Sequence, residues 1–193
     1  MIRFINKLIF TKIFGWRITG NVPNDNKIIA IVAPHTSAFD LFVGIFTRSV
    51  LHMEDRIKFL GKAELFKIPV FGYILKKLGG YPVIRNKQNN SVDSVVNIFK
   101  ENNKFFLALA PEGTREKVNK LKTGFYYIAL KAKVPIVLVG FDFRRRIVDF
   151  GEKFYPSGNI DVDMKKILTY FGQFYGRFPE KGLNHMVSWT YLL

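Results

Sequence analysis

KIIAIVAPHTSAFD, residues 27–40, joins an almost continuous apolar run to a polar turn that begins at Pro34. An apolar run without polar alternation predicts a strand that is covered on both faces. Similar runs recur at 57–61, 81–85, 104–110 and 135–141, and helix-like stretches recur between them at 39–52, 70–78, 91–102 and 121–132. This alternation predicts an α/β fold with a mixed, largely parallel central sheet covered by helices.

The chain beyond residue 142 has a weaker pattern. RRRIVDFG (144–151) predicts an edge strand, YPSGN (155–159) predicts a turn, and residues 163–176 predict a final helix. A chain of 193 residues without an internal repeat or linker fits one domain. We therefore expect a single domain over residues 19–193, preceded by an N-terminal amphipathic helix over residues 1–18.

The N-terminal stretch MIRFINKLIFTKIFGW is interrupted too often by polar and basic residues to span a membrane, which takes about 20 apolar residues. On a helix, one side carries Ile2, Ile5, Ile9, Ile13 and Trp16, while the basic residues lie elsewhere. This pattern predicts a helix that lies in a membrane interface. A helix that packs on its own domain is the alternative.

Composition narrows the class of partner. The 30 Lys and Arg residues against 15 Asp and Glu give a net charge of +15, which favours nucleic acid, a lipid surface or a phosphorylated substrate. An aromatic content of 16% favours a long apolar ligand or a membrane face. The chain has no cysteine, and its three histidines lack metal-ligand spacing, so we expect no metal site. The phosphate loop and the dinucleotide fingerprint are also absent from the sequence.

Polar clusters follow three of the predicted strands, namely PHTSAFD, RNKQNN and PEGTREK. Because ligands bind beyond the carboxyl ends of strands in open α/β sheets, we expect one composite site there. We place His35 on the strand-to-helix turn and Asp40 in the first helical turn, where the carboxylate can orient the imidazole and leave its other nitrogen as a base. Ser37 and Asp40 also form an S-x-x-D pattern, a variant of the capping box. The alternative interpretation is therefore that these residues only start the helix.

The PEGTREK cluster contains groups suited to a phosphate. Gly113 permits close approach, Thr114 offers a hydroxyl, and Arg115 can clamp an anion in bidentate fashion. The alternative is a solvated turn in which Glu112 and Arg115 pair at the surface. Arg85, at the end of the 81–85 run, is either a further cation of the site or a plain surface charge.

Taken together, these blocks resemble the lysophospholipid (glycerophosphate) acyltransferase family over roughly residues 20–145. The stretch His35 to Asp40 matches its H-x4-D block, GGYPVIR matches the block that ends in Arg85, PEGTR matches the third block, and VPIVLVG (134–140) matches the fourth. KTG, which begins at Lys122, reads like one of the family's connecting segments. Two departures, Pro34 in place of Asn and Ala110 in place of Phe, bear on the identity of the acceptor.

The resemblance implies a glycerol-3-phosphate acyltransferase-like fold and transfer of a fatty acyl group from an acyl carrier protein or coenzyme A thioester to the hydroxyl of a lysophospholipid such as 1-acyl-glycerol-3-phosphate. It implies no cofactor beyond the acyl donor. His35 is then the base and Asp40 its orienting partner, and the substrate-binding residues are Arg85, Glu112, Gly113, Thr114, Arg115 and Lys122.

The implied location is the cytoplasmic face of a membrane, with peripheral or monotopic attachment to an anionic surface. Three alternatives remain open at this point: a phospholipid transacylase, a lyso-aminolipid acyltransferase, and a catalytically silent basic module that binds membranes. We do not expect nucleic acid as a partner, because the aromatic residues lie mainly inside apolar runs.

Overall fold

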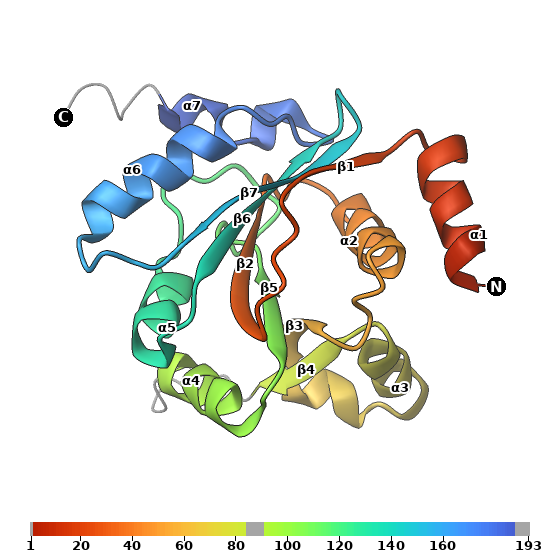
Figure 1. Cartoon of the computed structure of the whole chain (residues 1–193), viewed down its shortest axis with the longest axis horizontal. Helices are drawn as coiled ribbons and strands as arrows, with labels where there is room; N and C mark the ends of the chain where they lie inside the picture. Colours follow the sequence, from red (N-terminus) through yellow and green to blue (C-terminus); the bar gives the residue numbers. More distant parts are fainter. Residues whose placement is uncertain (1, 84–90, 188–193) are drawn as a thin grey trace.

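The computed structural model describes residues 2–83 and 91–187. Within these ranges the strands form one seven-stranded sheet in the order β1-β7-β6-β2-β5-β3-β4, with helices on both sides (Figure 1). The strands are β1 (Arg17–Gly20), β2 (Lys27–Ala33), β3 (Ile57–Lys62), β4 (Gly80–Val83), β5 (Phe105–Leu109), β6 (Ile136–Asp142) and β7 (Ile147–Phe154). Neighbouring strands are parallel except for the antiparallel pair β6 and β7. The predicted α/β class with a mixed, largely parallel sheet is confirmed.

Strand β2 shows why the central runs are apolar throughout. Its alternate residues enter two separate cores: Ile29 and Ile31 join one cluster, and Ile28 and Ala30 join the other. All four side chains are almost fully buried. Both faces of the sheet are therefore covered, as the continuous apolarity predicts.

The helices cover the two faces as layers (Figure 1). One face carries α1 (Ile2–Leu8) and α2 (Phe39–Val50), and the other carries α4 (Ser91–Glu101), α5 (Gly124–Ala132) and α6 (Ile160–Phe171). Helix α3 (Pro69–Lys77) lies beside β3 and β4, and the short α7 (Asn184–Val187) lies near α6. Helix α6 begins three residues earlier than predicted, because the Asn159 side chain accepts a hydrogen bond from Val162 N–H at 3.3 Å and caps it.

The strand predicted at 144–151 is present as β7 (Ile147–Phe154), but its predicted position at the edge of the sheet is wrong. Strand β7 is internal, because β1 pairs with it in parallel on its outer side. Strand β1 has only four residues and is mostly exposed, so it carries no apolar pattern from which it can be predicted. Main-chain pairing with β7 stabilises it instead.

The N-terminal segment is a helix that the domain itself holds. Helix α1 continues as a π-helical turn over Ile9–Ile13, and the sheet begins at Arg17, so the helical part is shorter than the predicted 1–18. Trp16, expected on the interfacial side, is instead buried with Phe10 in the second core cluster. Phe4 and Ile13 remain exposed at 72% and 68%. Among the described residues, no helix is long and apolar enough to cross a membrane.

Candidate active site

Two of the polar clusters meet because their strands are neighbours. Strands β2 and β5 pair in parallel, so their carboxyl ends lie at the same edge of the sheet. His35 follows β2 by two residues, and Glu112 follows β5 by three. The backbone N–H of His35 donates a hydrogen bond of 2.7 Å to Oε1 of Glu112, which ties the two turns together.

His35 and Asp40 form a hydrogen-bonded pair. Nδ1 of His35 lies 2.9 Å from Oδ2 of Asp40, and the same oxygen accepts hydrogen bonds from the backbone N–H groups of Thr36 at 2.9 Å and Ser37 at 3.0 Å. One buried carboxylate therefore holds both the helix start and the imidazole. With Nδ1–H donating to Asp40, Nε2 carries the lone pair and is the nitrogen that can accept a proton.

Glu112 lies beneath this pair. Its side chain is 3% exposed, Oε1 accepts from His35, and Oε2 has no hydrogen-bond partner among the described residues. Burial raises the pKa of Glu112 to about 7, although the His35 N–H opposes the shift. The alternative of a solvated Glu112–Arg115 pair is wrong, because Glu112 points into the protein.

The turn after β5 is shaped around Gly113 and Lys122. Gly113 has a φ of +66°, and a Cβ there would lie 2.7 Å from Cε and Nζ of Lys122. The Lys122 backbone N–H also donates to the Pro111 carbonyl at 2.8 Å. The positive φ at 113 therefore favours glycine, and the end of the flexible Lys122 side chain lies against it. This contact brings the Lys122 ammonium group to the site.

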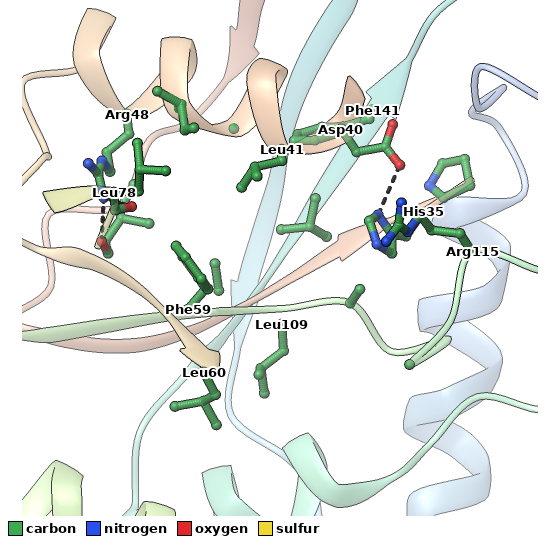
Figure 2. A pocket seen from close by; sticks show the side chains of 18 of the residues that line it. His35, Asp40, Leu41, Arg48, Phe59, Leu60, Leu78, Leu109, Arg115 and Phe141 are labelled. Carbon is green, nitrogen blue, oxygen red and sulfur yellow. Dashed lines mark hydrogen bonds and ion pairs between the residues drawn. The ribbon is translucent and has the colours of Figure 1, made fainter. Parts of the chain in front are cut away.

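The His35–Asp40 pair lies at one end of a cavity of about 560 Å³ (Figure 2). His35, Asp40 and Arg115 lie at that end, and Gly113 and Thr114, which directly precede Arg115 in the chain, also line the cavity. The rest of the lining is mainly apolar and consists of Val32, Pro34, Leu41, Gly44, Ile45, Ile57, Phe59, Leu60, Leu78, Ala108, Leu109, Ala110 and Phe141, with Arg48 at the far end. Arg85 lies outside the described residues.

Arg48 lies at the end of this cavity away from His35 (Figure 2). It is 6% exposed and donates hydrogen bonds to the carbonyls of Leu78 at 2.5 Å and Lys77 at 3.2 Å, which end helix α3. Cations are favoured at such a helix terminus, while burial lowers the pKa of Arg48. Gly79 has a φ of +90°, and any Cβ there would overlap the guanidinium.

Arg48 was not among the residues predicted for the site, although its spacing along α2 carried a signal. Asp40, Gly44 and Arg48 recur at intervals of four residues and so share one face of α2. The structure turns that face toward the cavity. A charged residue on the same helical face as a candidate catalytic carboxylate was the available clue.

A His–Asp pair with a buried carboxylate and a partly exposed imidazole, which lines an apolar cavity together with an arginine, defines a site suited to proton abstraction next to an anionic, partly apolar substrate. Comparison with known proteins agrees with this class. The family model described as Acyltransferase matches residues 16–142. The chain belongs to this acyltransferase family, which confirms the resemblance to the 1-acyl-sn-glycerol-3-phosphate acyltransferases.

Two curated relatives illustrate the similarity. The chain is 28% identical over 173 residues to the 1-acyl-sn-glycerol-3-phosphate acyltransferase of Streptococcus pneumoniae, covering 79% of this chain and 61% of the relative. It is 30% identical over 153 residues to the chloroplastic enzyme BAT2 of Brassica napus, covering 76% of this chain and 42% of the relative. The chain thus spans about two-fifths to three-fifths of the length of these relatives.

A solved structure supports the fold. The crystal structure of the 1-acyl-sn-glycerophosphate acyltransferase PlsC from Thermotoga maritima matches with a TM-score of 0.55 and 20% sequence identity. The match covers 88% of this chain and 75% of that one. The two proteins therefore share a fold across most of this chain.

Proposed function

We propose that this protein transfers a fatty acyl group from an acyl thioester to the hydroxyl of a lysophospholipid such as 1-acyl-glycerol-3-phosphate, in phospholipid biosynthesis. The observation that carries the proposal is the His35–Asp40 pair, 2.9 Å apart, at the end of an apolar cavity that Arg115 also lines. Family membership and the names of the curated relatives support the reaction type.

The His35–Asp40 pair, called the dyad below, is suited to promote attack by a hydroxyl on a thioester. Nε2 of His35 accepts the hydroxyl proton while the oxygen bonds to the carbonyl carbon of the thioester. The imidazolium that forms is stabilised by Asp40, to which Nδ1–H donates. When the C–S bond breaks, the departing sulfur takes the proton from Nε2, and the ester and the free thiol leave. These proton and acyl transfers need neither a metal nor a covalent acyl-enzyme.

Arg115 and Lys122 supply the positive charge that a phosphate-bearing acceptor needs. Arg115 lines the cavity that His35 also lines (Figure 2), and the Lys122 ammonium lies against Gly113 of the same turn. A guanidinium can hold a phosphate by two parallel hydrogen bonds and so fix its position. We assign these two residues, with Thr114, to the acceptor phosphate, and Arg85 remains a proposed member of this set.

The apolar remainder of the cavity suits an acyl chain, which would run from the dyad toward Arg48 along α2. A volume of about 560 Å³ lies within the usual range for small-molecule sites. The acyl donor, whether acyl carrier protein or coenzyme A, would present its thioester carbonyl at the His35 end.

The test is acyl transfer followed by release of free thiol. Both thioester donors are offered with a panel of acceptors, namely 1-acyl-glycerol-3-phosphate, lyso-aminolipids and glycerol-3-phosphate. We expect acceptor-dependent thiol release that is lost in His35→Ala and strongly reduced in Asp40→Asn, with unfolding temperatures close to that of the wild type. Transfer that persists in folded His35→Ala would overturn the mechanism. Transfer from a phospholipid donor without any thioester would identify a transacylase instead.

We also propose peripheral attachment to an anionic membrane surface, on the cytoplasmic side from which thioester donors reach the protein. Large apolar side chains are exposed on the neighbouring helices α1 and α2, among them Phe4, Leu8, Leu41 and Phe42. The net charge of +15 adds attraction to anionic lipids.

Vesicle co-sedimentation tests the attachment. We expect the wild type to bind vesicles that contain phosphatidylglycerol and the double variant Phe4→Ser, Leu8→Ser to bind less. The matched control is Val162→Ser, since Val162 is 48% exposed on α6, across the sheet. Equal binding by all three proteins would refute a role for α1 in membrane attachment.

A further inference from the structure

The chain beyond α6 returns to the candidate active site. Residues 172–185, which we call the C-terminal clasp, run from the end of α6 to the start of α7. The family match ends at residue 142, so the clasp lies outside the matched region. Nothing in its sequence pattern indicated a connection with the site.

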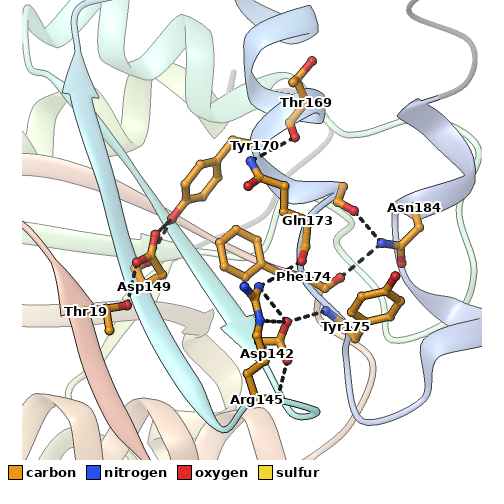
Figure 3. Close-up of polar contacts among 11 residues, drawn as sticks. Thr19, Asp142, Arg145, Asp149, Thr169, Tyr170, Gln173, Phe174, Tyr175 and Asn184 are labelled. Atoms are coloured by element: carbon orange, nitrogen blue, oxygen red, sulfur yellow. Dashed lines mark hydrogen bonds and ion pairs between the residues drawn. The ribbon is translucent and has the colours of Figure 1, made fainter.

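The clasp is fixed at its beginning to strand β6. The backbone N–H of Phe143 donates to the Tyr175 carbonyl at 2.8 Å. The Tyr175 N–H donates to buried Asp142 at 3.3 Å (Figure 3). The ring of Phe174 packs so closely on Gly140 that a Cβ there would lie 2.4 Å from it. These contacts leave this part of the clasp little freedom relative to the sheet.

The next residues of the clasp lie against the turn that carries His35. The Phe178 N–H donates a hydrogen bond of 3.2 Å to Oγ1 of Thr36, which is 2% exposed. Gly176 lies so near that a Cβ would be 2.5 Å from the same oxygen. Arg177 stacks over Phe39, with 3.6 Å between its guanidinium carbon and the ring centroid.

Thr36 connects the clasp to the dyad. While its hydroxyl accepts from Phe178, its backbone N–H donates to Oδ2 of Asp40 at 2.9 Å, and that oxygen also holds the His35 ring. A displacement of Thr36 therefore moves both the histidine that precedes it and the carboxylate that orients the ring.

The end of the clasp contacts the turn that carries Arg115. Nε2 of His185 lies 3.0 Å from the Val118 carbonyl, and Lys181 forms an ion pair of 2.9 Å with Glu116. The ion pair is exposed and contributes little. The partly buried histidine contact is the stronger link to this turn.

We propose that the C-terminal clasp positions both halves of the site, with Thr36 and Gly176 as positioning residues for the His35–Asp40 pair and His185 as a positioning residue for the Arg115 turn. The proposal rests on the proposed function for its kinetic consequences. Its physical basis is that catalytic groups must be held within a fraction of an ångström, since a misplacement of about 1 Å costs roughly a hundredfold in rate.

The contacts that the clasp makes with Thr36 and with the Arg115 turn should affect different kinetic constants. Thr36→Val keeps the shape of the side chain but removes the acceptor, so kcat should fall at least about tenfold while both KM values stay within about twofold. Thr36→Ser restores the acceptor and should recover most of kcat, whereas Gly176→Ala should lower it. His185→Leu should instead raise KM for the phosphate-bearing acceptor about fivefold, because the Arg115 turn loosens. The matched control is Thr169→Val, which removes an exposed hydroxyl bonded only within α6.

A spectroscopic measurement separates this proposal from the proposed function. The chain has three histidines, so nitrogen-15 labelling of histidine gives three imidazole spin systems to follow by NMR. We expect Thr36→Val to shift the His35 signals and to leave those of His52 in place, whereas Thr169→Val leaves all three unchanged.

The outcomes are distinct. Unchanged His35 signals together with wild-type kcat in Thr36→Val would overturn the proposed positioning role of the clasp. A loss of kcat that Thr36→Ser does not recover, accompanied by an equal fall in unfolding temperature, would show ordinary packing and also overturn it. If the wild type transfers no acyl group, the proposed function fails, and the His35 signals alone decide whether the clasp positions the dyad.

Discussion

A side chain introduced at Gly44 should shorten the acyl chain that the protein accepts. Gly44 lines the cavity on α2, and an added Cβ there would meet no heavy atom within 4 Å. The Cβ itself therefore causes no clash, and a larger side chain extends from a residue that lines the cavity. Replacing a helical glycine by alanine or leucine even stabilises the helix, by about 0.5 to 1 kcal/mol.

The helix geometry gives the size of the effect. At a rise of about 1.5 Å per residue, Gly44 lies roughly 6 Å beyond Asp40, and Arg48 lies roughly 12 Å beyond it. An extended alkyl chain advances about 1.25 Å per carbon at ordinary bond lengths and angles, so about five carbons fit between the level of Gly44 and Arg48. Excluding four or five methylene groups at about 0.8 kcal/mol each costs roughly 3 to 4 kcal/mol.

The assay measures kcat/KM for a series of thioester donors of increasing chain length, and then for a series of acceptors. Gly44→Leu and Gly44→Phe should lower kcat/KM for long chains by roughly 10² to 10³ and leave short chains nearly unaffected. Whichever series responds identifies the substrate whose chain occupies the cavity. Gly124→Leu is the matched control, since Gly124 also has open space and does not line the cavity. An unchanged length profile in Gly44→Phe would refute the assignment of the cavity to an acyl chain.

Three further predictions concern binding and stability. Arg115→Lys loses bidentate geometry and should raise KM for a phosphate-bearing acceptor roughly tenfold, measured by steady-state kinetics, and an unchanged KM would remove Arg115 from the phosphate site. Because burial raises the pKa of Glu112 from 4.5 to about 7, its stabilising contribution is present at low pH and is lost as the pH rises through 7. Relative to Glu112→Gln, the wild type should therefore lose about 3 kcal/mol of unfolding free energy between pH 4.5 and 8 in urea titrations, and parallel pH profiles would contradict this. Phe10→Ala, at a residue that is 1% exposed, should cost about 3 to 5 kcal/mol of unfolding free energy, whereas Phe4→Ala, at a residue that is 72% exposed, should cost about 0.5 kcal/mol or less.

The sequence predicted the central strands closely, because a strand that is buried on both faces has a continuous run of apolar residues. Strand β2 was predicted at its observed bounds, and the site edge followed from where the apolar runs stop. Strand β1 has no such apolar run, because an exposed four-residue strand is stabilised mainly by main-chain pairing with β7. Trp16 was predicted on the membrane-facing side of the N-terminal helix, but it is buried. The helix ends before Trp16, and the π-helical turn changes the angular spacing that a regular helix implies.

The sequence by itself determined the α/β class, the His35–Asp40 arrangement on a strand-to-helix turn, and the position of Gly113 and Arg115 just after a buried strand. These features depend on contacts within a few residues or on apolar runs that continuous burial requires. Only the tertiary structure decided that Glu112 is buried and accepts a hydrogen bond from His35, that Arg48 lines the apolar cavity, and that Phe178 contacts Thr36 across 142 positions of the chain. Such contacts join residues far apart in sequence, and no local periodicity records them, because they arise from the packing of complete elements against one another.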